Sequence, residues 1–260
     1  MHVRAARPDD YDEWLRFWSY LGIAGTPPGR ERWVEHLAPH TIFGEDSGEL
    51  VAYNLAFAFG DRGDVRQVAV SPDARRRGVG KALMTAVAAK LRAAGCREWR
   101  LEVRADNAAA IALYRSAGMT PHHDIHTVQI STTDCERFAA ARSGMHAVTA
   151  VVADDDPALE AALDLGRGQI ARWRLFRANA PQMRVGTTAM MQVIRDFAPD
   201  FGLLFPFVAP DADVAAHLIA AALPGPVAYE IQLTQAPIHA ALLAAGAVPR
   251  EHLIELAGAL

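Results

Sequence analysis

The stretch VAVSPDARRRGVGKALM, residues 68–84, joins an apolar, strand-like segment to an apolar segment with helical spacing. Between the two segments lie Arg75, Arg76, Arg77, Gly78 and Gly80. A glycine-containing loop that leads into a helix directs several backbone N–H groups at one point, and the helix dipole adds to the attraction for negative charge. Arginines beside such a loop supply charge-assisted hydrogen bonds. The stretch therefore predicts a site for a phosphate or a pyrophosphate.

Other interpretations of the same stretch are open or excluded by the rest of the chain. A solvated basic turn before a surface helix fits the loop alone equally well, because short glycine motifs have many false positives. A dinucleotide site of the GxGxxG type is excluded, because the second spacing is missing and no suitably placed acid follows. The chain has 26 Lys and Arg against 30 Asp and Glu, so its net charge of −4 argues against a nucleic-acid partner.

The segments around this stretch predict an α+β fold with a mixed, mostly antiparallel sheet flanked by helices. Helices are predicted where apolar residues recur at helical spacing, over residues 8–22, 80–95 and 107–118. Strand-like runs occupy residues 2–7, 41–45, 50–59, 64–70, 98–105 and 126–131.

The bulk composition indicates a folded protein of one large or two ordinary domains. The chain has 260 residues, of which 51% are hydrophobic and 22% charged. Its two cysteines, Cys96 and Cys135, offer neither a disulfide framework nor metal-ligand spacing, which favours a reducing, cytoplasmic location. The N-terminal segment lacks the apolar core of a signal peptide, and no apolar run approaches the roughly 20 residues of a membrane span, so we expect no membrane partner.

The second half of the chain repeats the pattern of the first. FPFVAPDADVAAHLIAAAL, residues 205–223, follows the order of residues 66–84: apolar strand, proline, Asp-Ala, helix. YEIQLTQAPIHAALLAAGAVP, residues 229–249, lines up with LEVRADNAAAIALYRSAGMTP, residues 101–121. The second copy has DVAAH where the first has its arginine–glycine loop, and Leu242 where the first has Tyr114. We interpret this as an internal duplication that kept the fold and lost the site.

VAVSPDARRRGVGKALM followed by LEVRADNAAAIALYRSAGM resembles the acyl-CoA-binding core of the GNAT acetyltransferases. In that family an Arg/Gln-x-x-Gly-x-Gly/Ala loop holds the pyrophosphate of CoA, and Arg75, Gly78 and Gly80 match it. The resemblance implies a GNAT fold duplicated as two GNAT-like halves. We expect a catalytic domain over residues 1–132, a connector over 133–145 and a degenerate GNAT-like domain over 146–260.

The resemblance also implies how acetyl-CoA, the acyl donor, binds. The backbone of the strand before the loop would pair with the pantetheine arm as if with another strand, and N–H groups from the loop and the first helical turn would hold the pyrophosphate. The implied contact residues are Val68, Ala69, Val70, Arg75, Arg76, Arg77, Gly78, Val79, Gly80, Lys81, Asn107 and Tyr114.

Two residues are candidates for the chemistry. Tyr114 is the implied acid, since a phenol with an ordinary pKa near 10 is protonated at neutral pH and can donate to the CoA sulfur. Glu102 is the candidate base, because residues 101–119 resemble the RimI-type N-terminal acetyltransferases, in which this glutamate is assigned as the base. Glu230 keeps the same place in the second copy, which points instead to a structural role. Asp64 and a water relay to bulk solvent stay open as alternatives.

The expected reaction is transfer of an acetyl group to a primary amine by direct attack in a ternary complex, because no positioned cysteine nucleophile is apparent. The acceptor is a protein N-terminus, a small amine, an aminoglycoside-like drug or a polyamine. The two-halved layout is similar in outline to mycothiol synthase, but there the C-terminal half is active, so no substrate carries over. A non-catalytic acyl-CoA-binding module is the alternative function, and a homodimer is one option for the C-terminal half.

The segment PHHDIH, residues 121–126, raises the question of a metal site. His122, His123 and His126 have no suggestively spaced fourth ligand, and the resembled family uses no metal. We therefore predict loop histidines that meet solvent or local hydrogen bonds, and no metal.

Overall fold

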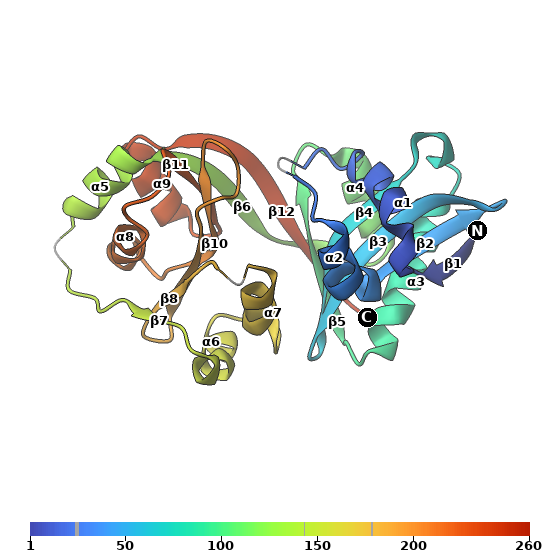
Figure 1. Cartoon of the computed structure of the whole chain (residues 1–260), viewed down its shortest axis with the longest axis horizontal. Helices are drawn as coiled ribbons and strands as arrows, with labels where there is room; N and C mark the ends of the chain where they lie inside the picture. The colour runs from blue at the N-terminus through green and yellow to red at the C-terminus, as the bar shows by residue number, and fades with distance from the viewer. Residues whose placement is uncertain (24–25, 143, 178) are drawn as a thin grey trace. The chain divides into compact units, whose positions relative to one another are not determined.

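The computed structural model describes residues 1–23, 26–142, 144–177 and 179–260. The chain forms two compact units (Figure 1): unit 1 comprises Met1–His122 and Ile254–Leu260, and unit 2 comprises His123–Leu253. The divisions fall inside two long strands, β6 (Thr120–Ser131) and β12 (Val248–Ala259). Strand β6 therefore begins in unit 1 and ends in unit 2, and strand β12 does the reverse.

Unit 1 has the order that the sequence predicts: strand, helix, antiparallel strands, then strand, loop, helix, strand and helix. Its strands before β6 are β1 (His2–Ala5), β2 (Thr41–Asp46), β3 (Glu49–Phe59), β4 (Arg62–Val70) and β5 (Glu98–Arg104). Its helices are α1 (Tyr11–Trp18), α2 (Arg30–Arg32), α3 (Val79–Ala93) and α4 (Ala108–Ser116).

The sheet of unit 1 has the strand order β1-β2-β3-β4-β5-β12 and lies between two helical layers. Strands β4 and β5 are parallel, whereas β1 to β4 pair antiparallel. On one face, Val65 and Leu101 share a buried cluster with Leu83 of α3. On the other face, Phe17 of α1 packs against Tyr53 of β3, with ring centroids 5.3 Å apart. The sheet is thus mixed and mostly antiparallel, as predicted.

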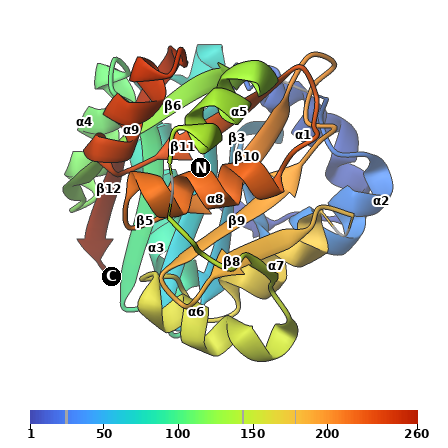
Figure 2. The same cartoon turned by 90° about the vertical axis from the view of Figure 1, so that its left-hand side faces the viewer.

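Unit 2 repeats this order of elements. Its strands before β12 are β7 (Thr149–Ala150), β8 (Gln182–Val185), β9 (Ala189–Ile194), β10 (Gly202–Val208) and β11 (Ala228–Leu233). Its helices are α5 (Thr132–Ala140), α6 (Asp156–Ala162), α7 (Gln169–Phe176), α8 (Ala212–Ala221) and α9 (Ala236–Ala244). Figure 2 shows α5, α8 and α9 in front of the strands of this unit.

The topologies of the two units show the internal duplication directly. The strand order is β1-β2-β3-β4-β5-β12 in unit 1 and β7-β8-β9-β10-β11-β6 in unit 2. Adding six to each of the first five strand numbers of unit 1 gives the first five strands of unit 2. The last strand in each order comes from the other half of the chain. The two halves therefore share one fold and exchange their final strands.

Because of this exchange, the borders of the compact units lie after His122 and before Ile254, whereas the expected domain borders lie at residues 132 and 146. The end of β6 pairs antiparallel with β11, from Ala228 opposite Ser131 to Leu233 opposite His126. The last residues of β12 complete unit 1 instead. Without β12, strand β5 would be the edge of the sheet of unit 1, with unpaired backbone groups on the side away from β4. The expected connector contains most of α5, which packs against α8.

Three smaller observations bear on the expectations from sequence. PHHDIH lies within strand β6, so its histidines are strand residues rather than loop residues. Cys96 and Cys135 are buried and have free thiols. No helix in the described part of the chain is both long enough and apolar enough to cross a membrane.

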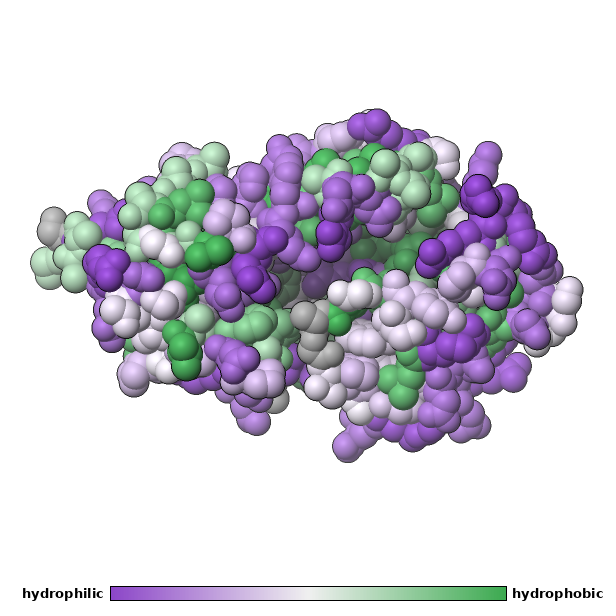
Figure 3. Space-filling view, turned by 90° about the horizontal axis from the view of Figure 1, so that it is seen from above, coloured by the Kyte–Doolittle hydropathy of each residue, from purple (hydrophilic) through white to green (hydrophobic). Residues whose placement is uncertain are grey.

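Exposed hydrophobic side chains are scattered over the surface. Figure 3 shows hydrophobic residues in separate patches among hydrophilic ones on the face that it presents. Val227 and Leu175 are among the large hydrophobic residues with more than half of their surface exposed. Such single exposures are normal in globular proteins and indicate no particular partner.

Candidate active site

Strands β4 and β5 are paired for only part of their length. Arg62 to Val65 lie opposite Glu98 to Leu101, and no further pair joins the two strands over their described residues. On its other edge β4 stays paired with β3 as far as Val70. The end of β4, which contains Val68, Ala69 and Val70, therefore presents a backbone edge that no neighbouring strand of unit 1 covers. An extended molecule can pair with such an edge by main-chain hydrogen bonds.

The loop after β4 is held at its beginning by a backbone hydrogen bond to β3 and ends at the start of α3. The Ser71 backbone N–H donates to the Val51 carbonyl at 2.8 Å, and Ala74 is buried. Gly78 is the N-cap of α3, with φ at +80° and ψ at −2°. This left-handed conformation favours glycine, which explains the first glycine of the motif. The Gly78 N-cap has no side chain, so it leaves the first N–H groups of α3 without an internal anionic partner.

The basic side chains around this loop differ in what they contact. Arg75 donates from Nε to the Val70 carbonyl at 3.2 Å, so its guanidinium lies over the end of β4. Arg77 pairs with Asp46 of β2 at 2.9 Å. Arg76, in the left-handed region with φ at 58°, makes no hydrogen bond or ion pair with the described residues. Arg76 and the exposed Lys81 are therefore the cations best able to meet an added anion.

Helix α4 lies beside this helix start. A Cβ on Gly80 would lie 3.1 Å from Cδ2 of Leu113, so the second glycine of the motif allows α3 and α4 to approach closely. Val79, between the two glycines, is buried in the same core. Asn107 is the N-cap of α4, and its side-chain oxygen accepts a hydrogen bond from the Ala110 N–H at 3.1 Å. Asn107 thus has a structural role that is independent of any ligand.

Tyr114 lies on α4, which follows the end of β5 that no longer pairs with β4. Its side chain is 7% exposed, and burial raises its pKa to about 12. Its hydroxyl makes no hydrogen bond with the described residues. The phenol is therefore protonated throughout the neutral range, and its O–H is available to a ligand.

The candidate bases lie on one face of the sheet. Leu101 and Val103 belong to the core beneath α3 and α4, so Glu102 between them faces the opposite side, as the alternation predicts. Asp64 lies opposite Arg100 in the β4–β5 register, which places it on the same side as Glu102. Burial raises the pKa of Asp64, an effect that Arg66, 3.5 Å away, opposes and Glu102 reinforces.

A third carboxylate on this face, Glu255, was not predicted from the sequence. Glu255 is on β12, between Ile254 and Leu256, which pack in the core beneath α3 and α4. Glu255 therefore faces the side of Asp64 and Glu102, and its Oε1 lies 3.7 Å from Arg100 Nη1. No local pattern in the sequence identifies it, because only the exchange of strand β12 brings it into unit 1.

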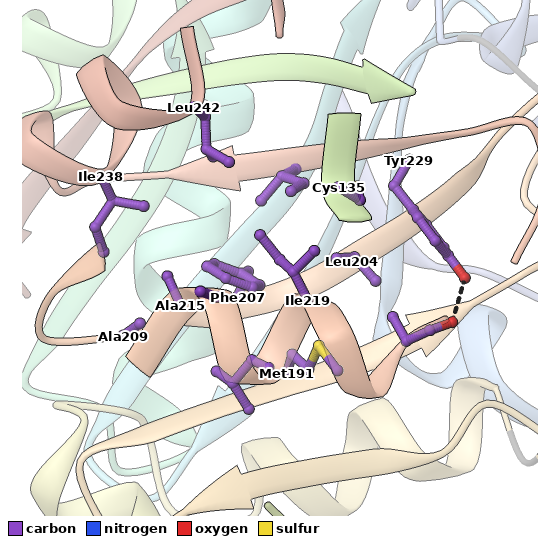
Figure 4. Close-up of a cluster of buried hydrophobic side chains, with 14 of the residues drawn as sticks. Cys135, Met191, Leu204, Phe207, Ala209, Ala215, Ile219, Tyr229, Ile238 and Leu242 are labelled. Carbon is purple, nitrogen blue, oxygen red and sulfur yellow. Dashed lines mark hydrogen bonds between the residues drawn. The ribbon is translucent and has the colours of Figure 1, made fainter. Parts of the chain in front are cut away.

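The equivalent positions in unit 2 differ from those of unit 1 in three ways. When the two Pro-Asp-Ala triplets are aligned, Pro206 falls opposite Val68, and a proline has no N–H to donate. The N-cap of α8 is Asp211, which directly follows Pro210 and accepts from the Val214 N–H at 2.9 Å. Leu242, opposite Tyr114, points into the hydrophobic core with Ile238 (Figure 4).

Comparison with known proteins agrees with the geometry of unit 1. Residues 5–119 match the model of the Acetyltransferase (GNAT) family. An acetyltransferase of Sodalis glossinidius is 32% identical over 118 residues, which are 44% of this chain and 83% of that relative. An acetyltransferase of Pectobacterium atrosepticum is 31% identical over 118 residues, with 44% and 84% covered. The chain belongs to the GNAT acetyltransferase family.

Solved structures are similar in fold to this chain over its whole length. A putative acetyltransferase of Pyrococcus horikoshii superposes with a TM-score of 0.71 at 14% identity, covering 100% of this chain and 89% of that one. A tandem GNAT protein from the clavulanic acid biosynthesis pathway superposes with a TM-score of 0.64 at 15% identity, covering 99% and 98%. At such identities these structures show the fold alone. They support a chain made of two GNAT-like halves.

Proposed function

We propose that this protein is an acetyl-CoA-dependent N-acetyltransferase whose active site lies in unit 1. The observation that carries the proposal is the unpaired end of β4, which leads through the arginine–glycine loop to the uncapped start of α3. The pantetheine arm would pair with the backbone of Val68 to Val70. The pyrophosphate would accept from N–H groups of the loop and the first helical turn, with Arg76 and Lys81 alongside.

Acyl transfer also requires stabilisation of the leaving thiolate, and Tyr114 suits that task. A thiol has an ordinary pKa of about 8.5, well below that of a phenol with a pKa of about 12. Complete proton transfer from Tyr114 to the thiolate is therefore uphill. We propose that Tyr114 donates a hydrogen bond to the sulfur as the carbon–sulfur bond breaks, which lowers the energy of the transition state without ionising the phenol.

The amine must lose a proton before it attacks, and Glu102 is the proposed base. It lies at the end of β5 that no longer pairs with β4, on the face opposite α3 and α4. Asp64, on the same face, is the alternative base, and the charge of Arg66 acts on both carboxylates. Direct attack on the thioester in a ternary complex is the proposed route, because the two cysteines of the chain, Cys96 and Cys135, are both buried and therefore poorly exposed as nucleophiles.

We propose that unit 2 does not bind acetyl-CoA. Pro206 removes a donor where the pantetheine arm would pair. The carboxylate of Asp211 already accepts from the start of α8, where it would repel a phosphate. Leu242 supplies no hydroxyl. These three features of the degenerate half replace ligand contacts by contacts within the protein.

The proposed acceptor is a primary amine, either a protein N-terminus or a small amine. The likeness of residues 101–119 to RimI-type enzymes favours a protein N-terminus. A non-catalytic acyl-CoA-binding module predicts the same cofactor site but no turnover. Release of free CoA thiol from acetyl-CoA in the presence of spermidine or a peptide with an N-terminal alanine distinguishes the two.

Calorimetric titration with acetyl-CoA tests the cofactor site. We expect one site per chain and about 10- to 100-fold weaker binding for Arg76→Glu, because the variant replaces a charge-assisted contact by repulsion. Arg92→Glu is the matched control: it makes the same charge change at an exposed position near the other end of α3, and we expect its affinity to equal that of the wild type.

The titration has three outcomes that would contradict the proposal. Two sites per chain would show that unit 2 also binds the donor. Equal losses in Arg76→Glu and Arg92→Glu would mean that only the overall charge matters. No binding by the wild-type protein would leave a GNAT fold without its donor.

A further inference from the structure

Glu255 enters unit 1 from the last strand of the chain. Its neighbours Ile254 and Leu256 pack in the core beneath α3 and α4, and Leu256 is completely buried. The Glu255 side chain is 15% exposed, which is low for a carboxylate. A carboxylate held in this position has a cost in free energy unless it is neutral or paired.

The groups that face Glu255 are both basic and acidic. Arg100 of β5 is 3.7 Å away, but Arg100 also lies 3.4 Å from Glu98. Arg62 of β4 donates to the same Glu98 at 2.6 Å. Both arginines therefore also contact a second carboxylate, Glu98, and their charges favour the ionised form of Glu255.

Two further carboxylates and the imidazole of His122 also lie around Glu255. The charges of Glu102 and Asp64 both disfavour ionisation of Glu255, and with burial as the largest effect they raise its pKa to about 7. His122, exposed in β6, offers an imidazole nitrogen within 4.8 Å of a ligand atom of Glu255. In a group of carboxylates arranged in this way, one member can therefore take up and give back a proton near neutral pH.

We propose that Glu255 holds the proton that Glu102 removes from the acceptor amine. This role rests on the proposed function. Glu255 acts through Glu102 and is a positioning residue in that sense: it does not need to touch the substrate. The degenerate half of the chain thus supplies Glu255, a proton acceptor, to the active half.

The proposed step balances in protons and electrons. An N–H bond of the acceptor ammonium breaks, and its proton passes to Glu102 and then to Glu255. The nitrogen lone pair then forms a bond to the thioester carbonyl carbon. The carbon–sulfur bond breaks, and the sulfur leaves as a thiolate that accepts a hydrogen bond from Tyr114. The nitrogen became positively charged when it formed its bond to carbon, so it loses a second proton, and this proton ends on the thiolate to give the free CoA thiol. Glu255 finally returns its proton to solvent, with His122 as the exposed neighbour on that route.

The test compares Glu255→Gln with the wild type and with Glu251→Gln, a control on the same strand in unit 2. The measurement is kcat/KM from pH 5.5 to 9 with acetyl-CoA and either spermidine or an N-terminal-alanine peptide, in buffers that contain EDTA. For Glu255→Gln we expect a loss of about 10- to 100-fold at pH 7. The loss should shrink toward pH 9, where more of the amine arrives deprotonated. The KM for acetyl-CoA should not change.

Thermal unfolding gives a readout that needs no acceptor. The pKa of Glu255 is higher in the folded state than its ordinary value of 4.5. The stabilisation by its proton is therefore fully present below that value and is lost as the pH rises toward 7. A glutamine cannot lose this contribution, so Glu255→Gln should match the wild type near pH 4.5 and melt about 5 °C higher at pH 8. Glu251→Gln should show no such pH-dependent gain.

Each outcome bears on the proposal. If the kcat/KM of Glu255→Gln at pH 7 stays within about two-fold of the wild-type value, the proposal is wrong, because we expect a loss of at least about 10-fold. An equal loss in Glu251→Gln would also overturn it. A wild-type protein that binds acetyl-CoA but acetylates neither probe contradicts the proposed function for these amines. The pH dependence of unfolding then still decides whether Glu255 holds a proton.

Discussion

Removing the hydroxyl group of Tyr114 tests whether unit 1 is the catalytic half. For Tyr114→Phe we expect kcat to fall by about 100-fold or more, the usual effect of removing one hydrogen-bond donor to a charge that develops in the transition state. The Kd for acetyl-CoA should stay within about two-fold, because the hydroxyl meets the sulfur mainly as charge develops there. Stability should change little, since the Tyr114 hydroxyl has no hydrogen-bond partner to lose among the described residues.

Tyr229→Phe in unit 2 is the matched control for this experiment. The Tyr229 hydroxyl donates to the Ala222 carbonyl at 3.0 Å, so its removal should cost about 1 kcal/mol of stability and leave kcat unchanged (Figure 4). The opposite pattern, in which kcat falls only with Tyr229→Phe, would reverse the roles of the two units. Because the pKa of Tyr114 is about 12, a basic limb of the kcat profile at pH 8 to 9 that Tyr114→Phe removes would also be contradictory.

At this scale, the sequence allowed prediction of the residues that lie in local motifs. Gly78 and Gly80 have the expected places at the start of α3, and the sequence alternation alone placed Glu102 on the non-core face. Glu255 could not be predicted. Its role depends on neighbours from β4 and β5, about 150 or more positions earlier in the chain, and an isolated glutamate in a strand is usually a solvated residue.

At the scale of one loop and one helix, Gly78 defines how α3 begins. Gly78→Ala places a Cβ in open space, since no atom would lie within 4 Å of it, but forces an L residue to φ of +80°. The left-handed conformation costs about 1–2 kcal/mol for such a residue. We expect urea unfolding to show a loss of about that size, and acetyl-CoA binding to weaken as the loop shifts.

Gly29→Ala is the control that isolates the backbone effect. Gly29 is the N-cap of α2, it also has open space around it, and its φ is −65°. Any general disadvantage of alanine as an N-cap is therefore common to the two variants. If Gly29→Ala and Gly78→Ala lose equal stability, the positive φ of Gly78 carries no cost and the explanation of the first glycine is wrong.

Helices α1, α3 and α4 and most strands of unit 1 were predictable because their apolar periodicity is strong, whereas α2 was not predicted. The divergence of β4 from β5 was not predictable from the residues alone, since both are ordinary alternating strands and pairing is a tertiary property. The strand over PHHDIH was wrongly predicted as a loop. Its first residues, Thr120 to His122, are polar and exposed, so they give no alternating signal.

The exchange of final strands between the halves is a property of the whole chain. The duplication was visible in the sequence, but a repeat predicts two similar folds and does not say which copy of the last strand completes which sheet. Residues 123–131 pair with β11, and the end of β12 completes unit 1. A cut at residue 132 would therefore separate each unit from the strand that comes last in its strand order.

Leu256→Ala tests this exchange in the intact protein. Leu256 is completely buried in the unit 1 core, so truncating it should cost about 2–5 kcal/mol. Because Leu256 packs in the core of the proposed catalytic unit, hydrogen exchange should quicken in β5 and α3 and stay unchanged in β10 and β11. Val248→Ala, on the same strand but 57% exposed, is the control and should change neither unit. Faster exchange confined to β10 and β11 would instead mean that β12 serves only the C-terminal half, and Glu255 would then have no place beside Glu102.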